Sequence, residues 1–544
     1  MLGLAATLVL CVTGPGQGWQ ELKSAHFTLR TNLEPEAAMA AAREIERTRA
    51  ALLAAMWPAP HEAGIEPVDI IVLKDRADFE RYSAPGSRGL YSHSALPPRI
   101  VLWGAPSSWE ERLSELSPSG IPSGRTPVSA PQQVPNINRH TGGYFAAPAP
   151  AASQHSQPVD VELTAHVELV RQGSASVLRH ELAHHVASAV YGRLPLWFSE
   201  GQAQFLESLK LSEDGRSATV GLLNPAAWLE FRRIRAMTTL DVLRWNTPLS
   251  GLSQGDSLGL YGASWQLYEW LFTTHRDALH CFQEGLAAGE ASAAAWSRCF
   301  PDLDPKELDR VLWEFSRNGK PALLELTVPP VGFEVNIRPL TAAEYHLVRA
   351  QVALAAPRTP ELIAEAQSEV EQALAADPAS VGALQLLAPL VSPPTRLDNG
   401  RRAVSAHPDD GWAWLLLADA LWDTSGSAVE RYRAYQRAVE LLPDSPLVLG
   451  RAARNLLSRN ERPEALVLAE RAAQLAPWNA EVLAIHALAL AAAGRCVEGT
   501  SAAELARKLL PAGSGAMATV LDVGLARACP SEPPADAGVT TGQR

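Results

Sequence analysis

Five prolines recur at nearly constant spacing through the C-terminal part of the chain. They are Pro378, Pro408, Pro443, Pro477 and Pro511, and the intervals between them are 30, 35, 34 and 34 residues. Most of them follow an amphipathic segment that ends in Leu or Ala. Because proline cannot continue a helix, this spacing predicts successive units of about 34 residues, each containing a pair of helices. Stacking of such pairs predicts an all-α solenoid.

Small residues recur at matching places in these units, where they would let paired helices approach closely. In the last two units they are Ala453, Ala465, Ala472, Ala487 and Ala506, and Gly499 stands at the second place of the last unit. The pattern resembles that of tetratricopeptide repeats over about residues 345–530, although Gly499 departs from it. The resemblance implies a domain that binds a protein partner. A helical bundle without repeats is the alternative, and the unit interrupted by Pro393 and Pro394 fits the repeat least well.

A second constraint comes from Val177–Gly201, which reads V-L-R-H-E-L-A-H-H-V and, after a short turn, L-P-L-W-F-S-E-G. Residues four apart lie on the same face of a helix, so His180 and His184 can present two imidazoles to one metal ion. Glu181 is rotated by about 100° from His180 and can reach a water on that ion without being a ligand.

A zinc hydrolase needs a third protein ligand from outside this helix. Glu200 is the main candidate, because a short turn reverses the chain and Ser199 can cap a helix over residues 200–209. His185 is the alternative, but it is rotated by about 100° from His184 and should point elsewhere.

The motifs H-E-L-A-H and L-P-x-W-F-x-E-G-x-A resemble those of gluzincin metalloproteases, and most of all peptidase MA-like proteins, over about residues 170–210. The segment from Trp19, W-x-E-L-K-S-A-H-F, is more weakly similar to the opening strand of such domains. The resemblance implies a Zn²⁺ cofactor held by His180, His184 and Glu200, with Glu181 as catalytic base and a peptide or protein as substrate.

Two further residues, Gln204 and Tyr261, can be compared with the residues that gluzincins have at the corresponding positions. Gln204 stands where gluzincins often have an acidic residue that orients a ligand histidine, and an amide would raise ligand basicity less than a carboxylate. Tyr261, at the start of Y-G-A-S-W-Q-L, is a candidate catalytic donor to the oxyanion by analogy with related gluzincins. The alternative for Tyr261 is an aromatic ring packed on the core.

The expected fold is an α+β zincin-like metalloprotease domain followed by an all-α tetratricopeptide-repeat solenoid. The first domain is expected over residues 19–325, with a Pro/Ser-rich insertion at about 105–158 and strands at 19–32, 68–73 and 99–103. An extended linker is expected over 326–341, the repeats over 342–530 and a disordered tail over 531–544.

Residues 1–18 predict a signal peptide, because the apolar run Leu2–Val12 is too short to span a bilayer. No Lys or Arg precedes that run, which departs from the usual pattern. The mature chain is therefore expected to be exported, to the periplasm, cell envelope or extracellular space, without a transmembrane segment. Cys11 suggests a lipid anchor as an alternative, but Leu10 is too large for the residue that normally precedes a lipidated cysteine.

The remaining four cysteines suggest two disulfides, Cys281–Cys299 and Cys496–Cys529. The net charge of −12 comes with no basic stripe, so nucleic acid is not an expected partner. The predicted function is a zinc-dependent metallopeptidase with a repeat domain for protein interaction. The alternatives are a non-catalytic zinc-binding repeat scaffold of the cell envelope and another metal hydrolase, such as an esterase.

Overall fold

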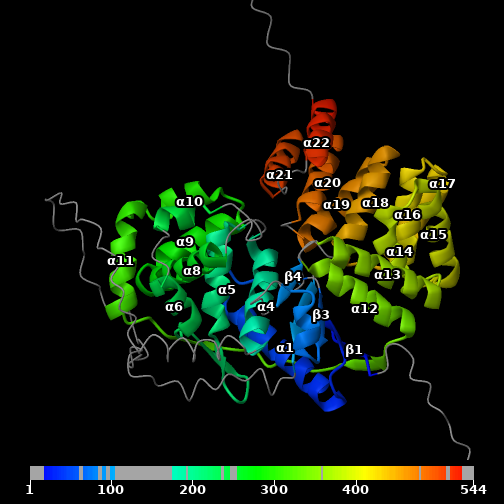
Figure 1. Cartoon of the computed structure of the whole chain (residues 1–544). Coiled ribbons are helices and arrows are strands. Elements are labelled where there is room, and N and C mark those ends of the chain that lie inside the picture. Colours follow the sequence, from blue (N-terminus) through cyan, green and yellow to red (C-terminus); the bar gives the residue numbers. More distant parts are fainter. Residues whose placement is uncertain are drawn as a thin grey trace, which may run out of the picture. The chain divides into compact units, whose positions relative to one another are not determined.

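The chain is divided into two compact units that alternate along the sequence. Figure 1 shows the helices and strands coloured in sequence order. The computed structural model describes residues 18–60, 65, 67–83, 89–92, 99–104, 174–191, 194–233, 238–245, 254–356, 359–476, 479–509 and 515–529. One unit contains residues 1–42, 66–105 and 333–472, and the other contains 43–65, 106–332 and 473–544. The predicted signal peptide (except its last residue), insertion and tail lie outside the described residues.

The first unit opens with a six-stranded mixed sheet in the order β4-β5-β3-β2-β1-β9. Strands β2, β3 and β5 are parallel, and the three other strands each pair antiparallel with a neighbour. The strands are β1 (Gln20–Lys23), β2 (Phe27–Thr31), β3 (Val68–Leu73), β4 (Leu90–Ser92), β5 (Arg99–Trp103) and β9 (Asn336–Pro339). Helix α1 (Pro35–Ala55) follows β2, and α2 (Arg76–Glu80) follows β3.

The strands expected at 68–73 and 99–103 are confirmed, whereas the single strand expected over 19–32 is wrong. The chain instead forms the hairpin β1–β2 there. The Ser24 hydroxyl accepts hydrogen bonds from the backbone N–H groups of His26 and Phe27, both at 3.1 Å, and this turn reverses the chain.

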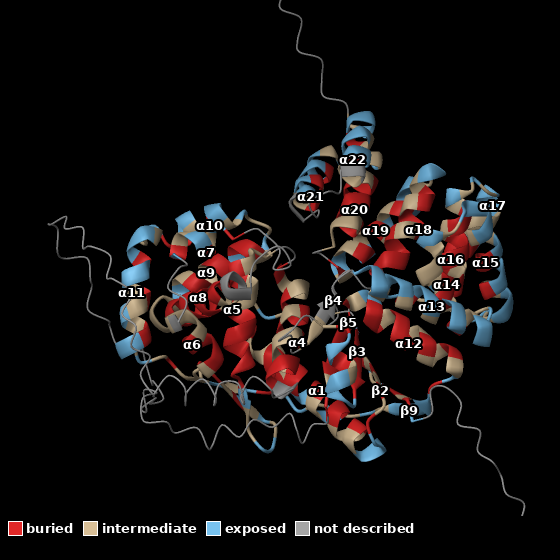
Figure 2. Cartoon of the chain, in the orientation of Figure 1, coloured by how far each residue is buried: buried red, intermediate tan, exposed pale blue. Residues whose placement is uncertain are grey.

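One face of the sheet is covered by the first pair of repeat helices, α12 (Ala342–Ala355) and α13 (Pro360–Ala376) (Figure 2). A cluster of buried hydrophobic residues joins Ile71 and Val101 of the sheet to Val348 and Val352 of α12. Strand β9 adds to the sheet edge immediately before α12, and Arg338 in β9 lies 2.8 Å from Glu21 in β1 and 2.7 Å from Glu344 in α12. The first repeat therefore shares its core with the sheet.

The linker expected over 326–341 is in part strand, and the expected division near residue 325 differs from the compact units. Strand β8 (Leu324–Thr327) pairs with β7 (Ser217–Val220), which also pairs with β6 (Lys210–Leu211), while β9 pairs with β1. Strands this short carry too few residues for a readable period-two pattern, so the sequence alone could not distinguish them from a free extended segment.

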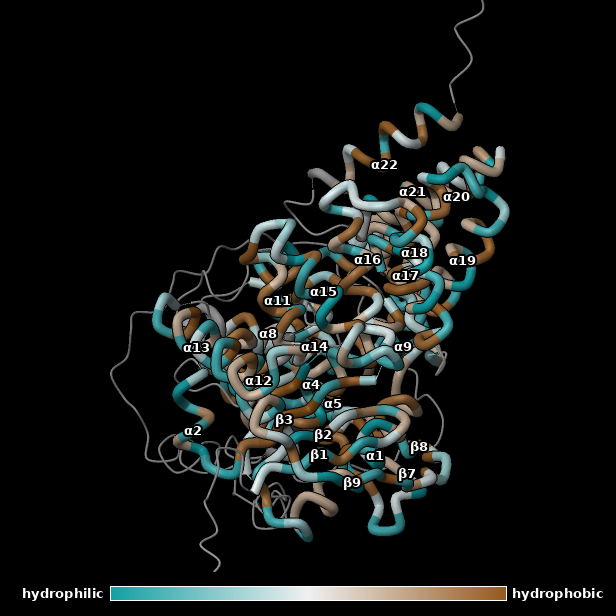
Figure 3. The backbone as a smooth tube through the Cα atoms, turned by 90° about the vertical axis from the view of Figure 1, so that its right-hand side faces the viewer, coloured by the Kyte–Doolittle hydropathy of each residue, from teal (hydrophilic) through white to brown (hydrophobic). Residues whose placement is uncertain are grey.

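From residue 342 to 528 the chain forms tetratricopeptide-like helix pairs, as the proline spacing predicts. Hydrophobic and hydrophilic stretches alternate along these helices (Figure 3). After α12 and α13 they are α14 (Val381–Leu387), α15 (Pro393–Ala406), α16 (Gly411–Asp423), α17 (Ala428–Leu441), α18 (Pro446–Ser458), α19 (Arg462–Leu475), α20 (Ala480–Ala492), α21 (Cys496–Leu509) and α22 (Gly515–Ala528).

The predicted small residues lie at helix contacts. Ala453, Ala465, Ala472, Ala487 and Ala506 are all fully buried. A Cβ atom on Gly499 would lie 3.0 Å from the carbonyl oxygen of Ala487, so this glycine also permits close approach of α20 and α21. The prolines at 393 and 394 begin α15 and do not break a helix, because proline is tolerated in the first turn.

The second unit is mainly helical between residues 174 and 318. Its helices there are α4 (Ser174–Tyr191), α5 (Leu196–Glu207), α6 (Pro225–Arg233), α7 (Thr239–Leu243), α8 (Gln254–Thr274), α9 (Arg276–Ala287), α10 (Ser292–Cys299) and α11 (Pro305–Asn318). Both predicted disulfides are present: Cys281–Cys299 joins α9 to α10, and Cys496–Cys529 joins α21 to the end of α22. Within the described part of the chain, no helix is long and apolar enough to cross a membrane.

Candidate metal centre

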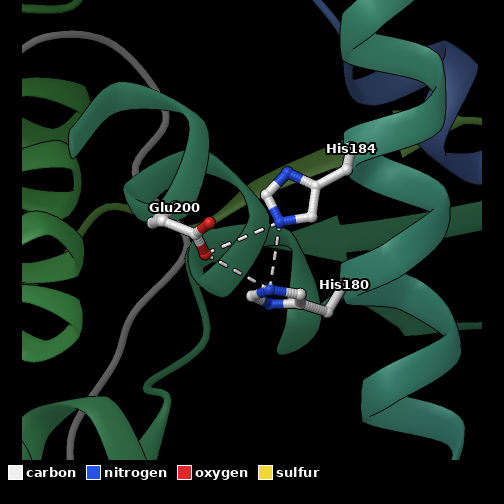
Figure 4. A group of neighbouring side chains, drawn as sticks. All are labelled: His180, His184 and Glu200. Carbon is white, nitrogen blue, oxygen red and sulfur yellow. Dashed lines mark hydrogen bonds and ion pairs between the residues drawn. The ribbon is translucent and has the colours of Figure 1, made fainter. Parts of the chain in front are cut away.

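Helix α4 presents His180 and His184 on one side and buries a row of apolar residues on another. Leu178, Leu182 and Val186 are fully buried. The two histidines project together towards α5 (Figure 4), as the spacing of four residues predicts. Each imidazole side chain is 13% exposed, so the site is recessed and still partly open to solvent.

Helix α5 begins at Leu196, three residues before the predicted cap. Pro195 takes the N-cap position, so Glu200 lies in the second turn of α5 and Ser199 is inside the helix. Two buried aromatic residues anchor this start: Trp197 stacks on Phe282 at 5.8 Å between ring centroids, and Phe198 packs edge-on against Tyr191 at 5.6 Å. The W-F pair of the motif therefore fixes the helix that carries Glu200.

Gly201 lets α8 pass close to this helix. A Cβ atom at this position would lie 2.5 Å from the carbonyl oxygen of Ser264 and 3.2 Å from the Cβ of Tyr268. One residue further, Gln202 donates hydrogen bonds to the hydroxyl groups of Tyr191 and Tyr268, at 3.4 and 3.3 Å. These contacts tie α4, α5 and α8 together around the site.

The three predicted ligands converge on one point. His180 Nε2 and His184 Nε2 are 3.2 Å apart, and Glu200 Oε2 lies 3.5 Å from the former and 3.6 Å from the latter. For a tetrahedral zinc with ligand bonds of about 2.05 Å, neighbouring donor atoms should be about 3.3 Å apart. Among the residues that the structure describes, Glu200 Oε2 is buried without a hydrogen-bond donor in good geometry. The donor set and its spacing therefore fit a zinc ion.

The carboxylates around the two histidines favour positive charge at this site. Burial lowers the pKa of His180, but Glu200, Glu207 and the nearby charge of Glu181 outweigh it and raise that pKa to about 10. Burial raises the pKa of Glu200, but the two histidines hold it well below its usual range. A positive charge at the centre of this cluster is thus strongly favoured.

Two residues that sequence reasoning missed contact the outer nitrogens of the imidazoles. Glu207 Oε2 lies 3.4 Å from His180 Nδ1, and Ser199 Oγ lies 3.1 Å from His184 Nδ1. The signal for Glu207 was its spacing of seven from Glu200, which returns to the same face of a helix. Gln204, the position that the family pattern singles out, instead accepts a hydrogen bond at its backbone oxygen from Asn224.

Glu181, His185 and Tyr261 are the remaining predicted site residues. Glu181 is half-buried on α4 beside His180. His185 is 4% exposed and lies outside the three-residue cluster, as expected from its rotation on the helix. Tyr261, in α8, packs edge-on against Trp245 at 6.3 Å, and its role as a donor stays a prediction.

Comparison with known proteins matches one segment of the chain to a family model. Residues 174–290, which include α4 to α9, match a family described as a protein of unknown function, DUF1570. No curated protein matches the chain.

Three solved structures share low similarity with the chain. MamA is 17% identical, with a TM-score of 0.25, over 31% of this chain and 91% of that one. The human IFIT1 dimer with m7Gppp-AAAA is 16% identical, with a TM-score of 0.27, over 59% and 70%. Yeast Tom70 is 14% identical, with a TM-score of 0.24, over 68% and 78%.

Proposed function

We propose that this chain is a zinc-dependent metallopeptidase of the gluzincin type. The observation that carries the proposal is the convergence of His180 Nε2, His184 Nε2 and Glu200 Oε2 at 3.2–3.6 Å. Two imidazoles and one carboxylate are a ligand set of catalytic zinc, and they leave a fourth position open. A structural zinc site would be closed by four protein ligands.

Each residue of the site has a separate role in the proposed peptide hydrolysis. Zinc bound here would supply Lewis acidity, which lowers the pKa of water and polarises a carbonyl group. Glu181 accepts the proton of the attacking water and donates it to the leaving amine. Its position supports this role, because it follows His180 on α4 and is only half-buried. Tyr261 is proposed as a donor to the developing oxyanion.

The helical repeats are proposed to bind a protein partner or to hold a protein substrate. Extended stacks of helix pairs expose long surfaces suited to this task. Export is proposed from the apolar N-terminal run, and the two disulfides support it, because disulfides persist in oxidising compartments.

The test combines metal analysis with a peptide digest. The purified protein should contain about one zinc per chain and cleave members of a broad peptide library. E181Q should keep the zinc and lose cleavage by about 10²–10⁴-fold. The control E213Q makes the same change at an exposed residue of the β6–β7 turn and should behave as wild type.

Two outcomes would contradict the proposal in different ways. A protein that takes up no zinc would remove the metal site altogether. Zinc without cleavage of any library member would favour the non-catalytic envelope scaffold.

A further inference from the structure

We infer that Glu207 is the residue that positions His180 for the metal, in the role that the sequence pattern assigns to position 204. The inference rests on the proposed function and adds to it a fourth residue of the site. Helix α5 then supplies both the third ligand, Glu200, and the carboxylate of Glu207 that orients the first ligand, His180.

The geometry gives Glu207 two links to the start of the metal motif. Its carboxylate Oε2 lies 3.4 Å from His180 Nδ1, and its backbone oxygen accepts a hydrogen bond of 2.7 Å from Arg179 Nε. The Glu207 side chain is only 5% exposed, so little water competes for the carboxylate. Residues 200 and 207 differ by about 20° around the helix, so both face α4.

The carboxylate decides which nitrogen of His180 is available to a metal. The negative charge of Glu207 Oε2, 3.4 Å from Nδ1, favours a proton on that nitrogen, and this leaves the lone pair on Nε2. Nε2 is the atom that faces His184 and Glu200 (Figure 4). A carboxylate partner also makes the imidazole a stronger donor to the metal.

The second histidine has a neutral partner. Ser199 Oγ, at 3.1 Å from His184 Nδ1, can accept the ring proton but carries no charge. Because the Glu207 carboxylate is charged and the Ser199 hydroxyl is neutral, Glu207 should contribute more to metal binding than Ser199 does.

Gln204 does not share this role. Within the described residues, its side chain makes no hydrogen bond or ion pair with either imidazole. Its replacement therefore serves as a matched control, one turn away from Glu207 on the same buried helix.

The experiment measures zinc affinity by competition with a chromophoric chelator, for the full chain and for E207A, E207Q and Q204A. E207A should bind zinc 10–100-fold more weakly, the range seen when such outer partners are removed. E207Q should lose about tenfold, because an amide keeps an acceptor and loses the charge. Q204A should stay within about threefold of wild type.

A second readout separates positioning from a purely structural role. Loss of structure alone would lower the thermal midpoint equally with and without zinc, whereas loss of positioning reduces the increase in midpoint that zinc produces. If E207A does not fold, E207Q decides the matter. Zinc affinity within threefold of wild type in a folded Glu207 variant would overturn the inference while leaving the metal site intact. A wild-type protein that binds no zinc would overturn both.

Discussion

The contact between α5 and α8 at Gly201 makes a quantitative prediction about both stability and metal binding. In G201A the new Cβ would lie 2.5 Å from the Ser264 carbonyl oxygen and 2.9 Å from its carbonyl carbon. Optimal carbon contacts are about 3.5–4.0 Å, so the two helices must separate by roughly 1 Å. Neither contacting atom belongs to a flexible side chain, and the strain cannot be relieved by a change of rotamer.

The expected loss follows from two opposing terms. Overpacking a core costs about 1–3 kcal/mol, and a backbone contact this short belongs at the upper end of that range. Replacing glycine by alanine within a helix returns about 1 kcal/mol. The net loss is therefore about 2 kcal/mol, which should lower the thermal midpoint of this unit by about 4–8 °C. Because Glu200 precedes Gly201, a shift of α5 should also weaken zinc binding by at least tenfold, since metal–ligand distances tolerate only about 0.2 Å.

Calorimetry and zinc competition test this prediction. The comparison variant is G499A, whose Cβ would lie 3.0 Å from the nearest atom and which restores the alanine of the repeat pattern. Its gain in helix propensity and its tighter contact should nearly cancel, to within about 1 kcal/mol. A G201A protein with the midpoint and zinc affinity of wild type would refute the close helix crossing on which the reasoning depends.

Three further predictions concern other parts of the fold. Replacing Cys496 and Cys529 by serine opens a link across 33 residues and should cost about 4 kcal/mol by loop entropy, measured as a lower urea midpoint for the last helices; an unchanged midpoint would contradict it. Arg338 and the cap of α12 lower the pKa of Glu344 despite its burial, so E344Q should lose about 1 kcal/mol at neutral pH. The difference in stability between E344Q and wild type should vanish when the pH falls below the pKa of Glu344, which is lowered from its ordinary value of 4.5, because the wild-type carboxylate is then protonated. A difference that persists at low pH would rule out the charge as its cause. A fragment beginning at residue 342 loses the sheet that covers α12, so it should aggregate or be cleaved by protease within α12, and a monomer with α12 protected would count against the shared core.

Local sequence patterns were sufficient to predict the structure of a segment wherever one periodic signal dominated it. The β-branched run Val68–Leu73 predicts a strand, and it forms β3 with all six residues buried. The proline spacing predicted the helix pairs after residue 341, because each pair must bury one face and end at a residue that cannot continue it. The spacing of four between His180 and His184 likewise depends only on the pitch of one helix, and the structure brings them together with Glu200 as predicted.

Tertiary structure decided the features that depend on contacts between distant segments. Strand β9 carries no distinctive pattern, and it becomes a strand because the edge of β1 offers it hydrogen bonds. Glu207 is an ordinary acidic residue in the sequence, and it acquires its proposed role only because α5 packs against α4 at the level of His180. The sequence alone was sufficient to predict which side chains one helix places on the same face. Which groups support those atoms from a second helix depends on packing angles and side-chain volumes, and these are determined only when the whole core is assembled.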